Sequence, residues 1–177
     1  MGIDPGYDRV GIGIIKRENN QDFYIYSACI QSDKKDEYIN RILYINNELE
    51  KIVKEYKPDL IVIESLFFAK NAKTAMNVAQ ARGSLLLTAA KYFYKKENHP
   101  IPQPLPKGKG GDTILELTPM QIKSSLVGDG HADKDKVSYM VYQILNLNKI
   151  ENWKNNRHID DEIDALSIAL AGAQYNK

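Results

Sequence analysis

The chain has 177 residues with a formal net charge of +1, and 27% of its residues are charged. This length suits one domain that buries a core without disulfides, and the balanced charge argues against a strongly basic nucleic-acid binder, although a local basic face can hide in the sum. The single cysteine, Cys29, lies in an alternating run and is interpreted as a sheet residue, not a nucleophile. One cysteine, no signal peptide and no apolar span of about 20 residues predict a cytoplasmic protein without a membrane segment.

The N-terminal part of the chain is predicted to be strands. Three strands are expected, over residues 1–4, 8–17 and 23–31. Pro5 and Gly6 form the first turn, and the polar residues 18–22 form the second, which makes a hairpin of the last two strands. The first strand is short at its start, so we expect a few residues to precede it.

A carboxylate, Asp4, ends the first strand. One interpretation is an ordinary turn residue, because Asp is frequent before Pro-Gly turns. The other is a cation ligand, because a carboxylate at the end of an apolar strand is costly unless a positive charge lies beside it. Asp4 alone does not decide between them.

An amphipathic helix and a buried strand follow. Apolar residues recur every three or four positions over residues 34–56, which predicts a helix that Pro58 stops. Residues 59–64 are a continuous apolar run that ends in Glu64, as expected for a strand buried on both faces in a parallel arrangement. An alanine-rich helix is predicted over residues 71–96, where small side chains favour close packing.

Residues 97–112 contain four prolines and three glycines and are predicted to be a flexible loop inserted in a single domain that spans residues 1–177. The loop carries Lys107 and Lys109. A solvated linker and a phosphate-contacting segment both fit this composition.

The last third of the chain is mostly helical. A strand is predicted over residues 113–117, and helices are predicted over residues 118–126, 133–146 and 160–173. Thr118 is expected to cap the first of these helices, with Pro119 at its first position. The order of elements predicts a mixed five-stranded sheet with helices on both faces, a three-layer α/β/α domain.

Four acids are predicted to meet at one edge of this sheet. Asp161 and Asp164 are three residues apart at the start of a helix, so they share one face, although the helix dipole alone also favours acids there. Asp4 and Glu64 emerge at the same edge if their strands are parallel neighbours. Such carboxylates cannot all stay ionised without cations, and an all-oxygen set suits Mg²⁺ or Mn²⁺. Two ions about 4 Å apart would support phosphodiester hydrolysis.

These motifs resemble those of RuvC, the Holliday-junction resolvase family of the ribonuclease H-like superfamily, over nearly the whole chain. The stretches that carry the resemblance are residues 2–6, 63–64, 67–71, 79–83, 116–123, 128–134 and 161–166. Each is weak alone, but together they occur in order with suitable spacing. The chain resembles a divergent member with a longer loop rich in Pro, Gly and Lys.

The resemblance implies a ribonuclease H-like fold and a homodimer that cuts four-way DNA junctions symmetrically with Mg²⁺, two ions per site, during recombination and repair. It also implies association with a branch-migration helicase. The positions that resemble the metal-binding catalytic acids of the family are Asp4, Glu64, Asp161 and Asp164.

The resemblance to the family also extends to basic and aromatic positions. The positions that resemble DNA-contacting residues are Phe67, Lys70, Arg82, Lys123 and Lys134. Phe67 falls on the aromatic that enters the junction, with a core residue as the alternative. The resemblance also implies a catalytic role for Lys123, because a lysine beside the site neutralises transition-state charge or anchors a phosphate. The alternative is an ordinary solvated lysine. His158 lies just before Asp161 and is kept as a candidate without a role.

Three other functions fit parts of the sequence. An actin-like or sugar-kinase ATPase opens with a similar strand, acid and glycine turn, but needs two lobes and a second glycine-rich loop that this sequence lacks. A related ribonuclease H-like nuclease that acts on RNA or an RNA–DNA hybrid remains open. A non-catalytic junction-binding dimer also remains open, although the presence of all four acids argues against it.

Overall fold

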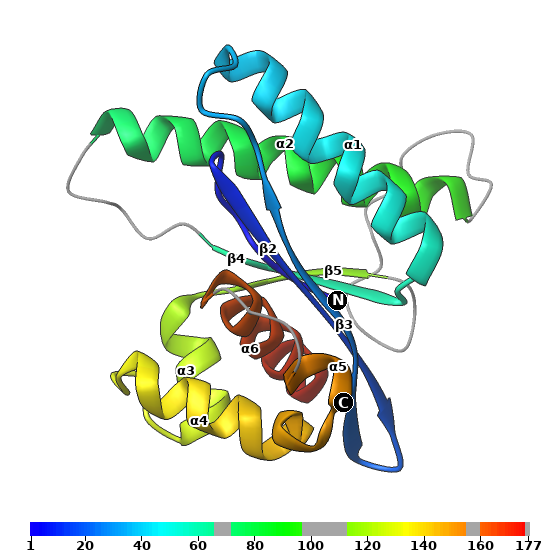
Figure 1. The fold of residues 1–177 in the computed structure, drawn as a ribbon, viewed down its shortest axis with the longest axis vertical. Coiled ribbons are helices and arrows are strands. Elements are labelled where there is room, and N and C mark those ends of the chain that lie inside the picture. The colour runs from blue at the N-terminus through cyan, green and yellow to red at the C-terminus, as the bar shows by residue number, and fades with distance from the viewer. Residues whose placement is uncertain (66–71, 97–112, 155–159, 176–177) are drawn as a thin grey trace.

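The computed structural model describes residues 1–65, 72–96, 113–154 and 160–175. Five strands form one mixed sheet in the order β3-β2-β1-β4-β5 (Figure 1). The strands are β1 Gly2–Asp4, β2 Arg9–Glu18, β3 Gln21–Gln31, β4 Leu60–Glu64 and β5 Thr113–Leu117. β1, β2 and β3 pair antiparallel, whereas β1, β4 and β5 pair parallel. The predicted mixed five-stranded sheet is confirmed.

The hairpin between β2 and β3 is tighter than predicted. Its turn consists of Asn19 and Asn20, with φ angles of 50° and 61°, in place of the expected five-residue turn. Both residues are in the left-handed region, where Asn is tolerated, and two such residues make the type I′ turn that matches the twist of paired strands. β2 and β3 therefore include residues at their turn ends that the polar composition had assigned to the turn.

Six α-helices and one short 3₁₀ helix are described. They are α1 Tyr38–Tyr56, α2 Ala72–Lys96, α3 Pro119–Val127, α4 Lys134–Leu145, α5 Glu151–Lys154, α6 Asp160–Tyr175 and the 3₁₀ helix Leu147–Lys149. α1 begins at Tyr38, later than predicted, because Asp33 forms a local turn in which its side chain accepts a hydrogen bond from the Lys35 N–H. The 3₁₀ helix and α5 are short elements that were not predicted from the sequence.

The predicted start of α3 is confirmed. Thr118 accepts a hydrogen bond from the Gln121 N–H, and the Gln121 side chain returns to the Thr118 backbone. This reciprocal capping box, with Pro119 at the first helical position, satisfies amide groups that have no partner inside the helix.

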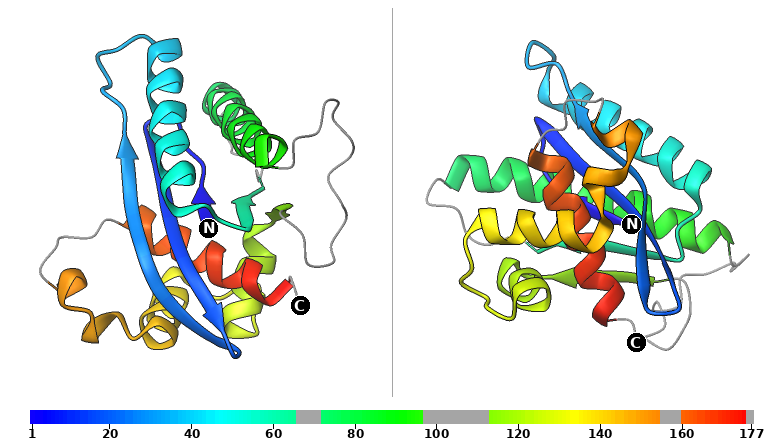
Figure 2. Two further views of the ribbon diagram at one scale, coloured as in Figure 1. Left: turned by 90° about the vertical axis from the view of Figure 1, so that its right-hand side faces the viewer. Right: turned by 60° about the horizontal axis from the view of Figure 1, so that its bottom comes forward.

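The helices cover both faces of the sheet, so the domain has the predicted three layers (Figures 1 and 2). α1 and α2 lie on one face, and α3, α4 and α6 lie on the other. Side chains alternate along β2: Val10, Ile12 and Ile14 are buried in the core that α1 and α2 cover. The described helices include none that is long and apolar enough to cross a membrane.

The opposite face of β2 is built for close approach. A Cβ added to Gly11 would overlap the carbonyl oxygen of Asp161, and one added to Gly13 would overlap the backbone of Leu166. The α6 backbone therefore rests directly on β2, and this contact fixes how far the N-terminal end of α6 lies from the end of β1. The predicted loop over residues 97–112 lies outside the described residues.

Candidate active site

Asp4 and Glu64 end two adjacent parallel strands. β1 and β4 pair with Ile3 opposite Ile63, so the two acids follow at the same edge of the sheet. Ile3 and Ile63 are both buried in the core under α1 and α2. Because side chains alternate along a strand, Asp4 and Glu64 belong to the other face, the face that α6 covers.

α6 places Asp161 and Asp164 beside those strand ends. It begins at Asp160, and the overlap at Gly11 shows that the Asp161 backbone lies against β2 next to Asp4. The negative charges of Asp161 and Asp164 both raise the pKa of Asp4, as expected for acids placed at the same end of the sheet. The structure thus brings together the four acids that the sequence singled out.

The acids raise one another's pKa values. Burial, followed by the charges of Asp164 and Asp161, raises the pKa of Asp4 to about 6. Burial, followed by the charges of Asp4 and Asp164, raises the pKa of Glu64 to about 7. Burial also raises the pKa of Asp164, against the opposing effect of Lys134. A partly desolvated group of like charges is the environment in which a bound cation gains most.

Two lysines predicted to lie at the site are there. Lys134, the first residue of α4, pairs with Asp164 at 2.9 Å and with Asp160 at 3.6 Å. The charge of Lys123, on α3, favours the ionised form of Glu64. Both lysines therefore partly offset the negative charge of the cluster.

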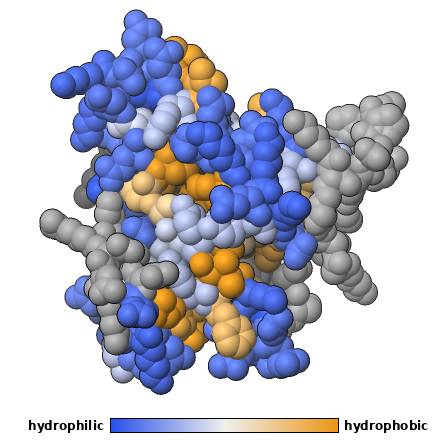
Figure 3. Space-filling view, turned by 45° about the vertical axis from the view of Figure 1, so that its right-hand side comes forward, coloured by the Kyte–Doolittle hydropathy of each residue, from blue (hydrophilic) through white to orange (hydrophobic). Residues whose placement is uncertain are grey.

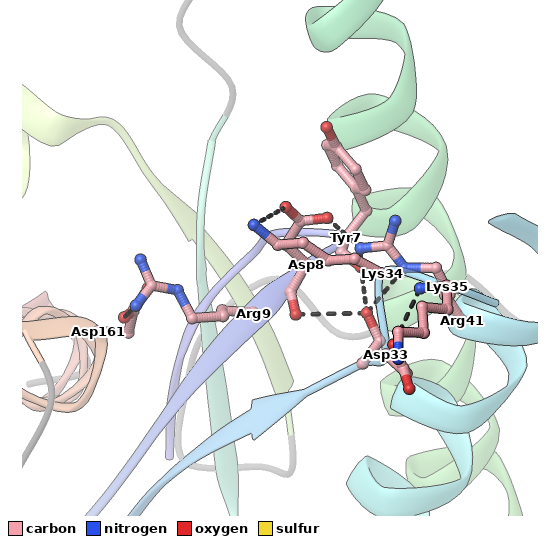
Figure 4. Close-up of polar contacts among 9 residues, drawn as sticks. Tyr7, Asp8, Arg9, Asp33, Lys34, Lys35, Arg41 and Asp161 are labelled. Atoms are coloured by element: carbon pink, nitrogen blue, oxygen red, sulfur yellow. Dashed lines mark hydrogen bonds and ion pairs between the residues drawn. The ribbon is translucent and has the colours of Figure 1, made fainter.

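A third cation, Arg9, was not predicted. Its guanidinium lies 3.4 Å from the Asp161 carboxylate, and Figure 4 shows it reaching across from β2 to α6. The sequence did carry a signal: Arg9 is two residues before Gly11, so the two share the strand face that packs against α6.

Arg82 supports the site from the other face of the sheet. Its Nε donates to the Glu64 carbonyl oxygen at 2.9 Å, and its guanidinium pairs with Glu116 on β5. The side chain is only 13% exposed. These contacts tie α2 to the ends of β4 and β5, and they indicate a positioning role for Arg82. Its predicted DNA contact stays a prediction.

The remaining predicted residues, Phe67, Lys70 and His158, lie outside the described residues. Their proposed roles stay predictions.

The donor set fits a hard cation. The four acids offer oxygen ligands only, and burial together with neighbouring negative charges raises the pKa values of Asp4, Glu64 and Asp164, a cost that a bound cation relieves. Within residues 1–65, 72–96, 113–154 and 160–175, no three His, Cys, Asp or Glu side chains are already gathered as a ready-made metal-holding group. Asp161 is paired with Arg9 and Asp164 with Lys134, so two of the four carboxylates have basic partners.

A mixed sheet that ends in acids, with a further acid pair on a covering helix, defines a nuclease-type site on a ribonuclease H-like fold. The family model described as "Crossover junction endodeoxyribonuclease RuvC" matches residues 1–101 and 109–172. The chain belongs to the RuvC family.

Relatives of that name span nearly the whole chain. The protein from Ruminiclostridium cellulolyticum is 39% identical, covering 96% of this chain and 88% of the relative. The protein from Thermosipho melanesiensis is 38% identical, covering 96% and 92%. The Thermus thermophilus RuvC structure is 25% identical with a TM-score of 0.74, covering 98% of this chain and 92% of that one. The same protein in complex with a Holliday junction substrate matches with a TM-score of 0.78 at 24% identity.

Proposed function

We propose that this protein is an endodeoxyribonuclease that resolves four-way DNA junctions by cation-dependent phosphodiester hydrolysis. The observation that carries the proposal is the meeting of Asp4, Glu64, Asp161 and Asp164 at one sheet edge, with the pKa values of Asp4 and Glu64 raised to about 6 and 7. The names of the relatives, and the match to RuvC solved with a Holliday junction, support the choice of substrate.

The four acids would hold two Mg²⁺ ions, which would supply the attacking hydroxide and stabilise the leaving oxygen. Mn²⁺ suits the same oxygen ligands. Lys123, whose charge already acts on Glu64, is placed to offset negative charge that develops on the phosphate. Lys134 keeps Asp164 oriented and, as an exposed cation, offers a contact to a nearby phosphate.

We also propose that the protein acts as a homodimer, since symmetric cutting of a junction needs two active sites. A groove of about 840 Å³ lies between α1 and α2, on the sheet face opposite the acids. Its lining includes the exposed apolar side chains Ile39, Leu43 and Leu87, which are 65%, 59% and 55% exposed. Figure 3 shows apolar residues in a hollow over this part of the molecule. A second copy of the chain that covers this groove would bury these side chains.

The dimer proposal predicts that Leu43→Glu weakens self-association at least tenfold, because a buried, unpaired carboxylate is costly in an apolar interface. Sedimentation velocity over a dilution series measures this. Lys51→Glu, on the same helix but paired with Glu48 and outside the groove lining, is the control. An unchanged dimer in Leu43→Glu would place the interface elsewhere.

The nuclease proposal is tested by cutting of labelled four-way junction, linear duplex and RNA–DNA hybrid with Mg²⁺. We expect paired symmetric nicks in the junction alone, and Asp4→Asn should abolish them while junction binding persists. Asp135→Asn, the same change at an exposed position of α4, should cut normally.

The other outcomes assign other functions. Cutting of the hybrid in place of the junction would make the protein a different ribonuclease H-like nuclease. Tight junction binding without cutting under Mg²⁺ or Mn²⁺ would make it a binding protein. Association with a branch-migration helicase, a cytoplasmic location and a single domain over residues 1–177 stay predictions.

A further inference from the structure

Arg9 is directed at Asp161 by the register of the sheet. Arg9, Gly11 and Gly13 alternate with Val10 and Ile12, which belong to the core under α1 and α2, and both glycines lie against the α6 backbone. Gly11 meets the backbone of Asp161 itself. A side chain two residues earlier on the same face must therefore emerge beside the first turn of α6. From this starting point the Arg9 guanidinium lies 3.4 Å from the Asp161 carboxylate.

The chain around Arg9 is anchored from the other side. The buried guanidinium of Arg41 pairs with Asp8, donates to the Tyr7 carbonyl oxygen at 3.2 Å and donates to Ser32 Oγ at 3.0 Å. In Figure 4, Asp8 points to this cluster while Arg9 points the opposite way, toward Asp161. Neighbouring residues of one turn thus serve two functions: Asp8 fixes the backbone, and Arg9 extends from that fixed backbone into the acid cluster.

The Arg9 side chain remains accessible while it holds Asp161. It is 53% exposed, whereas the Asp161 side chain is 20% exposed. A planar guanidinium binds carboxylate and phosphate with the same two-pronged geometry, so either partner suits it. While Asp161 ligates a cation, its carboxylate is less available to pair with Arg9. A DNA substrate that binds brings phosphate groups to the same place.

We propose that Arg9 is a substrate-binding residue that exchanges partners: it neutralises Asp161 in the cation-free protein and contacts a DNA phosphate once Asp161 ligates a cation. The exchange keeps Arg9 and Asp161 each beside an opposite charge in both states. It also means that Arg9 competes with the cation for Asp161 and strengthens the hold on DNA. This inference rests on the proposed cation dependence, and calorimetry on the wild-type protein tests that dependence before any variant is compared.

The first experiment measures Mg²⁺ and Mn²⁺ binding without DNA, by isothermal titration calorimetry. Arg9→Gln should bind the cation up to about fivefold more tightly, the range expected when a competing exposed ion pair is removed. Lys16→Gln is the control, because Lys16 is an exposed cation of the same strand that pairs with Glu18, away from the acids. The control should leave cation affinity unchanged.

The second experiment measures junction binding over a salt series with Ca²⁺, which takes the same oxygen ligands. Each Arg9 that contacts a phosphate should contribute about −0.9 to the slope of log K against log salt. The slope measured for Arg9→Gln should lack this contribution and be correspondingly shallower. Arg9→Lys should restore the slope, because it restores the charge. Lys16→Gln should keep the wild-type slope.

The two measurements have opposite expected signs, which makes the proposal easy to overturn. Tighter cation binding together with a smaller salt slope in Arg9→Gln supports the exchange. Weaker cation binding would show that Arg9 merely holds Asp161 in position, and an unchanged slope would show that Arg9 contacts no phosphate. Either result overturns the proposal. If the wild-type protein itself binds no cation, the proposed cation dependence fails instead.

Discussion

The two faces of the sheet are packed in different ways. Toward α1 and α2, the central strands present large aliphatic side chains, such as Ile3 and Ile12, which are fully buried. Toward α6, the same strands present Gly11, Gly13 and Asp4. At β1 and β2, one face therefore consists of interlocking side chains, and the other of helix backbone resting on strand backbone. At β4 and β5, the second face carries an apolar core of its own, which includes Val62 and Leu117.

This difference at the central strands shows how the fold makes room for chemistry on one face. Aliphatic packing supplies burial on the first face, since apolar area removed from water stabilises the fold. Glycines on the second face bring α6 close enough for Asp161 and Asp164 to reach Asp4. The same closeness concentrates like charges, so the face that carries the acids is also the face where the folded protein stores unfavourable electrostatic energy.

The largest effect is expected from Gly11→Ala. Its Cβ would overlap the Asp161 carbonyl, so α6 must move away from β2. We expect the free energy of unfolding to fall by about 3 kcal/mol and junction cutting to fall at least about a hundredfold, because small displacements of catalytic groups are costly. Urea unfolding and single-turnover cutting measure the two effects.

A matched glycine provides the control for that change. Gly83, in α2, has nothing within 4 Å of an added Cβ. Gly83→Ala should raise the free energy of unfolding by about 0.5–1 kcal/mol, through better helix propensity, and leave cutting unchanged. Equal behaviour of the two variants would contradict the difference between the faces.

An intermediate effect is expected from Arg41→Met. This change removes the ion pair with Asp8 and the hydrogen bonds to Tyr7 and Ser32 that anchor the β1–β2 turn. The free energy of unfolding should fall by about 2 kcal/mol, because partly buried polar groups lose their partner. Lys34→Met is the control: Lys34 also pairs with Asp8, but its side chain is 80% exposed, so the loss should stay within about 0.5 kcal/mol.

The smallest effect concerns pH. The folded-state pKa values of Asp4 and Glu64, about 6 and about 7, lie above the ordinary values of 3.8 and 4.5. Between about pH 4 and pH 7 the folded protein therefore holds protons that the unfolded chain releases, so its stability falls as pH rises through this window. We expect a loss of roughly 1–2 kcal/mol from pH 5 to pH 8 in EDTA, discounted for solvent screening of these partly exposed groups.

Urea unfolding at the two pH values, with wild-type protein and Asp4→Asn, measures this loss. The variant should show a smaller pH dependence than the wild type, because it lacks one of the acids whose pKa is raised. Saturating Mg²⁺ at pH 8 should restore stability to the wild type, since a cation that binds only the folded state stabilises it. The repulsion among the acids would be contradicted if the wild type became more stable from pH 5 to pH 8 while Asp4→Asn did not.

Much of this protein follows from patterns within a few residues of the chain. Alternation identified the strands, the Thr118-Pro119 start identified α3, and acids at the ends of two apolar strands identified Asp4 and Glu64. Such features are readable because strand alternation and helix capping depend on neighbours in the sequence. The meeting of Asp4 and Glu64 was predictable, because parallel neighbouring strands bring their ends to one edge.

The tertiary structure decided which partners the charged residues choose. Arg82, whose predicted DNA contact stays a prediction, pairs with Glu116 and donates to the Glu64 carbonyl oxygen, while Arg9, which lies outside the motifs, pairs with Asp161. These partners lie far apart in the sequence, and no local pattern encodes their distance. They meet only because glycines let α6 rest on β2 and because α2 crosses the ends of β4 and β5, so the pairing of charges is a consequence of how the layers pack.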